Sequence, residues 1–131
     1  MIPVYQSITG KGGRCFEACM ASIMEIPEAD VPYFGMSEKD FLINVQNWLA
    51  PMQLLYIEIE PVDADEKNVL SRAFEAGDVY HFALGYRLRA DGTTGGPHAC
   101  VARNAEVIWD PHPGSKGLAR IDGWGFLAVR K

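Results

Sequence analysis

Three residues along the chain have the side chains that make up a nucleophile, a base and an orienting acid: Cys15, His98 and Asp110. A thiol attacks a carbonyl carbon as the thiolate, and a free thiol is only slightly ionised at neutral pH, so it needs a base. An imidazole has a suitable pKa, and a carboxylate can hold it in the tautomer that accepts the thiol proton. These residues predict acyl-transfer chemistry with Cys15 as nucleophile, His98 as general base and Asp110 orienting the histidine.

Cys15 opens a segment that we expect to be a mostly buried helix. When CFEACMASIMEI is drawn as a helix, three polar residues fall on one arc and apolar residues cover the rest. Pro27 ends the helix, and Cys15 occupies its first turn. Unpaired backbone N–H groups and the positive end of the helix dipole are expected to stabilise a thiolate there.

His98 and Asp110 are predicted to lie on two adjacent strands. His98 follows a Gly-Gly-Pro turn and opens the strand HACVAR, next to a loop that can admit substrate. The next strand runs to Asp110, and Asn104 and Ala105 between the two strands suit a two-residue hairpin. With that hairpin, the imidazole and the carboxylate lie near the same end of the pair.

The elements that must position these residues form a helix-then-strand pattern. The 131 residues fit one domain, residues 1–131. Helices followed by antiparallel strands predict an α+β fold, in which a buried N-terminal helix packs on an antiparallel sheet. Beyond the first helix, we expect helices over Lys39–Ala50 (capped by Ser37, ended by Pro51) and Glu66–Ala76 (closed by Gly77), and strands over Gln53–Glu60, Val79–Leu88, His98–Arg103, Glu106–Asp110 and Gly125–Arg130.

Composition argues against several classes of partner and location. The net charge is -5, with scattered Lys and Arg, so nothing favours nucleic acid or an anionic membrane. The densest basic pair, Arg87 and Arg89, is interpreted as a solvated face. The amino terminus does not read as a signal peptide, and three cysteines do not suggest a disulfide framework, so a reducing, cytoplasmic location is expected.

Two blocks of the sequence resemble a known family. GGRCFEACMASIMEIP and HACVARNAEVIWDPHPG are similar to the cysteine and histidine–aspartate blocks of papain-like cysteine peptidases. The domain that removes double-glycine leaders from bacteriocins is the nearest of these. The chain also resembles small bacterial and phage proteins with a Q…C-F-x-A-C…H-x-V…D-P-H-P pattern. The middle of the chain, residues 31–80, shows no such likeness.

This resemblance implies a papain-like fold and a thiol peptidase or isopeptidase that acts on a peptide or protein through an acyl-enzyme, without metal or cofactor. It also implies that a glutamine before the nucleophile helps to bind the oxyanion. Gln6 is the only glutamine upstream of Cys15 and lies nine residues before it, further than the usual spacing of about six. The backbone N–H of Cys15 would be the second oxyanion donor.

Other hypotheses remain open at this stage. The same residues suit deamidation or acyl transfer on a host protein, and the same fold suits a binding protein without turnover. Cys15, Cys19, His98 and Cys100 formally make a four-ligand zinc set, but structural zinc sites usually take cysteines from turns rather than from a helix and a strand. His112 is interpreted as a loop residue near the cleft and His81 as a core histidine; the oligomeric state is left open.

Overall fold

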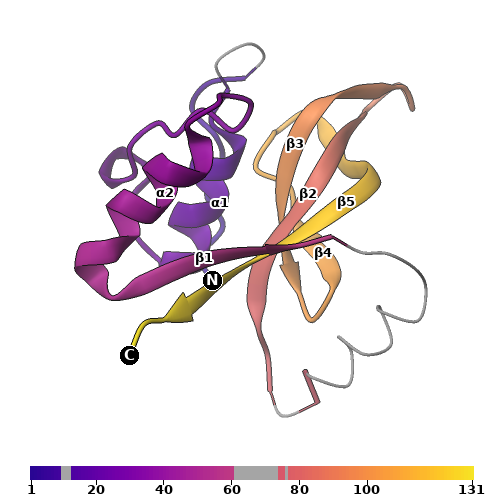
Figure 1. The fold of residues 1–131 in the computed structure, drawn as a ribbon. Helices are drawn as coiled ribbons and strands as arrows, with labels where there is room; N and C mark the ends of the chain where they lie inside the picture. The colour runs from indigo at the N-terminus through magenta and orange to yellow at the C-terminus, as the bar shows by residue number, and fades with distance from the viewer. Residues whose placement is uncertain (10–12, 61–73, 76) are drawn as a thin grey trace.

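The computed structural model describes residues 1–9, 13–60, 74–75 and 77–131. It has the expected α+β architecture, with two α-helices and a five-stranded antiparallel sheet of order β1-β5-β2-β3-β4 (Figure 1). None of the helices in these ranges is long and apolar enough to cross a bilayer. The elements are α1 (Cys15–Met24), α2 (Phe41–Leu49), β1 (Leu54–Ile59), β2 (Tyr80–Arg89), β3 (Thr94–Arg103), β4 (Glu106–Trp109) and β5 (Ser115–Val129), with short 3-10 turns at Glu28–Asp30 and Ala50–Met52.

Helix α1 forms where the sequence predicts it and is buried along most of its length. Its contacts with the sheet run mainly to β3, while α2 contacts β1 (Figure 1). Phe16 is the centre of the packing: its ring stacks on Phe82 at 4.6 Å and meets Phe41 and Tyr56 edge-on at 4.7 and 5.4 Å. Because Phe16 follows Cys15 directly, this aromatic cluster fixes the start of α1 against the sheet.

Two of the three polar residues on the arc, Glu17 and Ser22, are also buried, and each has a partner, while Glu25 is exposed just beyond the end of α1. The carboxylate of Glu17 accepts the backbone N–H of Phe34 at 3.0 Å. The hydroxyl of Ser22 accepts the N–H of Val4 at 3.0 Å and donates to the carbonyl of Ala18 at 2.8 Å. The amino-terminal segment is therefore bonded to α1 near its carboxyl end, which matters below for the position of Gln6.

Helix α2 begins two residues later than predicted, and Ser37 does not cap it. The residue before the helix is Asp40, which makes no side-chain cap. The chain turns first, since the N–H of Glu38 donates to Gly35 and the N–H of Phe41 donates to Glu38. Pro51 lies in the 3-10 turn that follows α2, so it ends the helix as expected.

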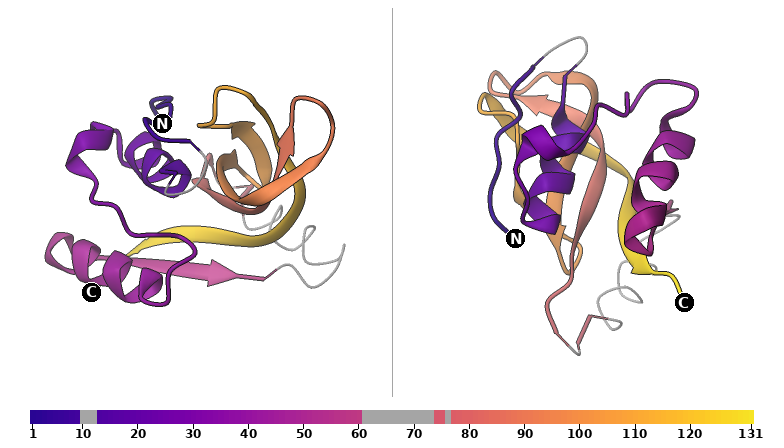
Figure 2. Two further views of the ribbon diagram at one scale, coloured as in Figure 1. Left: turned by 90° about the horizontal axis from the view of Figure 1, so that it is seen from above. Right: turned by 90° about the vertical axis from the view of Figure 1, so that its left-hand side faces the viewer.

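The strands differ most from expectation at β3 and β5. Strand β3 begins at Thr94, inside the predicted turn, and β5 begins at Ser115, ten residues before the predicted start at Gly125. Strand β5 is long because it pairs with β1 along one part and with β2 along another (Figure 2). The predicted strand Gln53–Glu60 is confirmed as β1. The predicted helix over 66–76 lies outside the described residues, apart from 74–75, which are in a turn.

Gly125, the predicted start of the last strand, lies well inside β5, and its surroundings show why a glycine is needed there. A Cβ added at Gly125 would lie 2.4 Å from the hydroxyl oxygen of Tyr56, so the Tyr56 ring packs directly on the glycine backbone. A glycine in a strand usually indicates a turn or a bulge, yet it is also required where another group approaches the backbone closely. Here the close approach is the reason.

Candidate active site

The hairpin between β3 and β4 places the acid next to the base. Asn104 and Ala105 have φ values of 50° and 66°, which confirms the predicted two-residue turn. Arg103 pairs with Glu106, but Val101 pairs with Trp109, so β4 carries one extra residue, Ile108, and forms a bulge. That bulge determines on which face of the sheet the side chains of the following residues lie.

Without the bulge, Asp110 would lie opposite Ala99 and point to the other face from His98. With it, continuing the register one step past Val101 and Trp109 places Asp110 beside Cys100, which alternates with His98 and shares its face. The sequence-based argument predicted that His98 and Asp110 lie close together. It did not predict the bulge that makes their contact possible.

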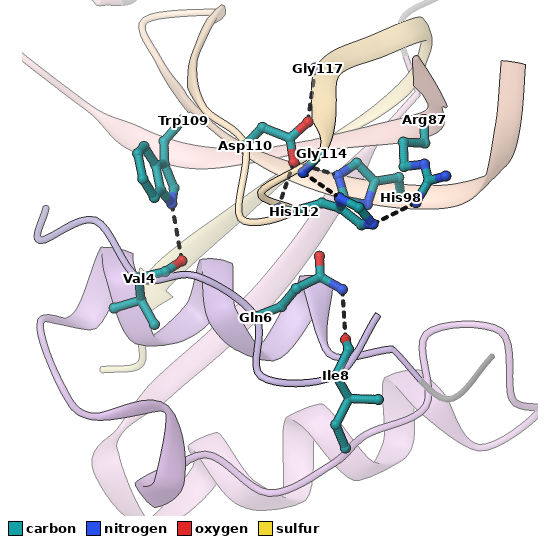
Figure 3. Close-up of polar contacts among 10 residues, drawn as sticks. All are labelled: Val4, Gln6, Ile8, Arg87, His98, Trp109, Asp110, His112, Gly114 and Gly117. Carbon is teal, nitrogen blue, oxygen red and sulfur yellow. Dashed lines mark hydrogen bonds and ion pairs between the residues drawn. The ribbon is translucent and has the colours of Figure 1, made fainter. Parts of the chain in front are cut away.

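His98 and Asp110 form a direct pair at the edge of the sheet. Nε2 of His98 lies 2.7 Å from Oδ1 of Asp110, and the His98 side chain is 3% exposed (Figure 3). The carboxylate also accepts the backbone N–H of His112 at 2.9 Å and of Gly117 at 2.8 Å. Since Asp110 accepts the hydrogen on Nε2, the lone pair of a neutral His98 lies on Nδ1, the nitrogen that can act as a base.

The same donors fix the charge of Asp110. Burial raises the pKa of Asp110, but the bonds from His98, His112 and Gly117 outweigh burial and hold the pKa below its ordinary value. Asp110 is therefore a carboxylate at neutral pH. It orients His98 and stabilises the imidazolium that forms when the base accepts a proton.

Cys15 is the first residue of α1, where the preceding Arg14 gives no side-chain cap. The backbone N–H of Ala99, the residue after His98, is close enough to the sulfur to lower the pKa of the thiol, so the nucleophile lies beside the strand that carries the base. Among the hydrogen bonds of the described residues, the His98 ring bonds Asp110, and none joins that ring to the sulfur. The two side chains meet at a cavity instead.

The protonation state of Cys15 differs from the sequence-based expectation. Burial raises the pKa of the Cys15 thiol to about 11, although backbone N–H groups of Ala99, Phe16 and Cys15 itself lower it. The start of the helix thus favours the thiolate, as expected, but loss of hydration dominates. The thiol is neutral at pH 7, so a base is required for attack.

One cavity contains three of the four predicted residues. Its volume is about 480 Å3, and Cys15, His98 and Gln6 all line it, together with His112. Asp110 lies behind His98 rather than in the lining. Of the three cysteines, only Cys15 lines this cavity, while Cys19 and Cys100 have no exposed surface.

Gln6 reaches the cavity because the amino-terminal segment is tied to the end of β4. The backbone N–H of Gln6 donates to Pro111 at 2.9 Å, and Nε1 of Trp109 donates to the carbonyl of Val4 at 3.0 Å (Figure 3). The spacing of nine residues from Cys15 therefore does not keep Gln6 away. The indole of Trp109 holds this segment against the end of β4.

The amide of Gln6 is only partly satisfied. Its NH2 group donates to the carbonyl of Ile8 at 2.7 Å, and one hydrogen of that group is left over. Oε1 is buried and has no hydrogen-bond partner among the described residues. Figure 3 shows this oxygen on the side of the amide that faces His98 and His112.

Sequence reasoning missed Arg87. The interpretation of Arg87 and Arg89 as a solvated face is wrong for Arg87, which is partly buried, and both arginines line the cavity. The guanidinium NH1 of Arg87 lies 2.7 Å from Nε2 of His112. The glycine at position 95 is a sequence feature linked to this burial. A Cβ there would lie 3.2 Å from Nε of Arg87, so the glycine leaves room for the arginine side chain.

The other two histidines are where the sequence suggested. His81 is buried, with Nδ1 3.1 Å from the carbonyl of Phe82 and Nε2 accepting the N–H of Ala105 at 3.0 Å. It is a core histidine with both ring nitrogens satisfied. His112 lies on the loop after β4 and lines the cavity.

A metal could in principle use His98, Cys100 and Asp110, whose ligand atoms lie within 4.8 Å of one another. The donors do not fit that role. Burial and the nearby carboxylate of Asp110 raise the pKa of Cys100, so its thiol is neutral, whereas zinc binds the thiolate. Both oxygens of Asp110 already accept N–H groups. Cys15 and Cys19, which complete the zinc set considered from the sequence, do not belong to this group.

The side chains that the sequence singled out therefore meet around one cavity: a thiol, an imidazole held by a carboxylate, and a buried amide. This arrangement provides a nucleophile, a base with a fixed tautomer and candidate donors for an oxyanion. Comparisons of the chain with protein-family models, curated proteins and solved structures found no match.

Proposed function

We propose that this protein is a cysteine-dependent hydrolase, a papain-like peptidase or isopeptidase that uses Cys15, His98 and Asp110. The observation that carries the proposal is the 2.7 Å bond between His98 Nε2 and Asp110, next to a cavity that both His98 and Cys15 line. A buried neutral thiol needs a nearby base, and an imidazole oriented by a carboxylate is such a base.

In the first step, Nδ1 of His98 takes the proton from Cys15 while the sulfur attacks the carbonyl carbon of the substrate. A new S–C bond forms, and the carbonyl electrons move onto oxygen as an oxyanion. The backbone N–H of Cys15 and the spare NH2 hydrogen of Gln6 are the proposed donors to this oxygen. Asp110 stabilises the imidazolium that His98 has become.

In the second step, His98 gives its proton to the leaving amine, the C–N bond breaks, and a thioester on Cys15 remains. Water then attacks the thioester while His98 takes one of its protons. The C–S bond then breaks, the acid product leaves, and His98 returns its proton to the sulfur to restore the thiol. Deamidation or acyl transfer on a host protein would use the same intermediate, so the products separate these reactions: released ammonia, a new amine terminus, or a new amide bond.

The test of the nucleophile is alkylation by iodoacetamide, with mass spectrometry to locate the adducts. Cys15 is expected to react much faster than Cys19 and Cys100, since those two have no exposed surface. In the wild type, His98 supplies the base, so the rate should already be high at neutral pH. In His98→Ala, the rate should be lower at neutral pH and should rise with pH toward the thiol pKa of about 11.

The test of the reaction is a peptide-based acyl probe followed by a search for turnover. An adduct on Cys15 that is absent from Cys15→Ala and slowed in His98→Ala supports the proposal. Hydrolysis that persists in Cys15→Ala would disprove it. A reactive Cys15 without turnover of any peptide or amide would favour the binding-protein alternative.

A further inference from the structure

The cavity next to Cys15 is lined by a cationic side chain, Arg87, that forms no ion pair with any carboxylate of the described residues. The Nε of Arg87 is buried without a hydrogen-bond partner among these residues. A buried guanidinium donor that is left unpaired costs free energy, so a bound ligand that supplies an acceptor gains correspondingly.

The contact between Arg87 and His112 does not satisfy the guanidinium. Nδ1 of His112 lies 3.0 Å from the backbone N–H of Gly114, and Nε2 lies 2.7 Å from NH1 of Arg87 (Figure 3). A neutral imidazole has only one acceptor nitrogen, so it cannot accept from both donors. Burial and the charges of Arg87 and His98 lower the pKa of His112, which keeps the ring neutral. Arg87 is the donor that is free to turn to a ligand.

The cavity that Arg87 and His98 both line carries more positive than negative charge. The cavity is lined by two arginines and one glutamate, Glu38, which is exposed at the rim. Arg89 donates to the hydroxyl of Thr93 and the carbonyl of Thr94, and the nearby carboxylate of Asp91 offsets part of its charge, so Arg87 is the main cation of the cavity.

A second cavity of about 470 Å3, which shares both His98 and Glu38 with the first, is lined by one lysine and, besides Glu38, by the carboxylates of Glu58 and Asp122. Asp122, one of these carboxylates, pairs with Arg120. The charge pattern therefore directs an anionic group to the side of His98 that carries Arg87.

We propose that the cavity beside Cys15 binds a carboxylate of the substrate through Arg87. This inference rests on the proposed function and names its substrate class: a peptide with a carboxylate close to the bond that is cleaved, either at its C-terminus or on an acidic side chain. The unpartnered Oε1 of Gln6, whose side chain is 7% exposed, is an acceptor for a peptide N–H of the same ligand. A planar guanidinium suits a carboxylate because it donates two parallel hydrogen bonds.

The test measures binding in the Cys15→Ala variant, so that no chemistry occurs. Backbone amide NMR signals are followed during titration with three peptides: acetyl-Ala-Ala with a free carboxylate, acetyl-Ala-Ala amide, and acetyl-Glu-Ala amide. The free acid or the glutamate peptide is expected to bind at least about tenfold more tightly than the first amide, with shifts at His112 and Gly114. Whichever of the two binds identifies the source of the carboxylate.

Substitutions then assign the preference to Arg87. In the Cys15→Ala background, Arg87→Gln should weaken binding of the preferred acid about tenfold, and Arg87→Lys should weaken it less, since charge remains while the planar fork is lost. Arg103→Gln, on an exposed residue at the far end of β3, is the matched control and should not change binding. Melting curves verify that each variant folds.

Equal affinity for acid and amide, unchanged binding in Arg87→Gln, or no binding of any of the three peptides would overturn the inference. These outcomes differ from failure of the proposed function. An alkylated, active Cys15 without carboxylate preference leaves the hydrolase proposal standing. If a carboxylate binds through Arg87 but Cys15 is inert, the binding inference stands and the hydrolase proposal fails.

Discussion

At the scale of single residues, Asp110 is the most constrained group of the site. Its Oδ1 accepts from His98 and His112, and its Oδ2 accepts the N–H of Gly117. Two of these donors are backbone groups and cannot move far, so the carboxylate keeps its orientation. The direction in which His98 presents Nδ1 is therefore set by the loop after β4.

We predict that Asp110→Asn reduces turnover about 10²- to 10⁴-fold, the range that a positioned acid–base group contributes. An asparagine presents an NH2 group to donors that require an acceptor, or it stops accepting the hydrogen on Nε2. In both cases, Nδ1 of His98 loses its role as base. The measurement is kcat/KM with any substrate found by the acyl probe, next to melting temperatures. A variant that folds and keeps full activity would contradict this role of Asp110.

Gln6 allows a prediction that separates acyl transfer from simple alkylation. Gln6→Ala should lower the rate of thioester formation about 10²- to 10³-fold, the usual cost of one oxyanion donor. Alkylation of Cys15 by iodoacetamide develops no oxyanion and should change little. If Gln6→Ala slows both reactions equally, Gln6 acts by holding the cavity together instead.

At the scale of elements, the one-residue bulge in β4 determines whether the site exists. Ile108 is the extra residue, and it is partly exposed, at 38%. A hairpin without it would keep its turn at Asn104 and Ala105 but would place Asp110 on the opposite face from His98.

Deletion of Ile108 is therefore expected to leave a folded protein without the His98–Asp110 pair. The measurable result is loss of turnover to the level of Asp110→Asn, together with a changed His98 ring signal in NMR spectra. Ile108→Val retains the residue count and serves as the control, with activity near wild type. A deletion variant with normal activity would show that the bulge is unimportant.

The long strand β5 depends on a different local feature, the glycine beneath Tyr56. Gly125→Ala should destabilise the protein by about 1 to 3 kcal/mol, because the new Cβ overlaps the Tyr56 ring. Gly123→Ala is a matched control on the same strand, since its nearest neighbour atom would lie 3.6 Å away, an ordinary contact. Urea unfolding of both variants tests the prediction. Equal stabilities would mean that Tyr56 can move aside.

At the scale of the whole molecule, the sequence predicts well what depends on neighbouring residues. The helix that starts at Cys15, the turn at Asn104 and the approach of His98 to Asp110 all follow from local patterns. The predictions that were wrong concern properties that depend on contacts between distant segments of the chain. The raised pKa of Cys15 and the partial burial of Arg87 arise only when the chain packs. The residue types therefore predict which reaction a side chain can take part in, while burial in the folded protein determines whether that side chain is protonated.

The same principle applies to the stability of the whole domain at mildly acidic pH. His81 is buried against the rings of Trp124 and Phe126, and burial lowers its pKa. The native state then binds fewer protons than the unfolded chain. The stabilisation is present above the ordinary histidine pKa of about 6.5 and decreases as the pH falls below it. Glu17 acts in the opposite sense, because burial raises its pKa.

Replacement of His81 by glutamine should isolate this effect, since the glutamine oxygen can still accept the N–H of Ala105. We predict that the wild type loses more stability than His81→Gln between pH 7 and pH 5, with a difference of at most about 1.4 kcal/mol per pH unit for one proton. Urea unfolding at several pH values gives both curves, and the contribution of Glu17 cancels in their difference. His112→Gln should flatten the curve less, because His112 is less buried than His81. Parallel curves for wild type and His81→Gln would show that His81 takes up its proton without unfolding the core.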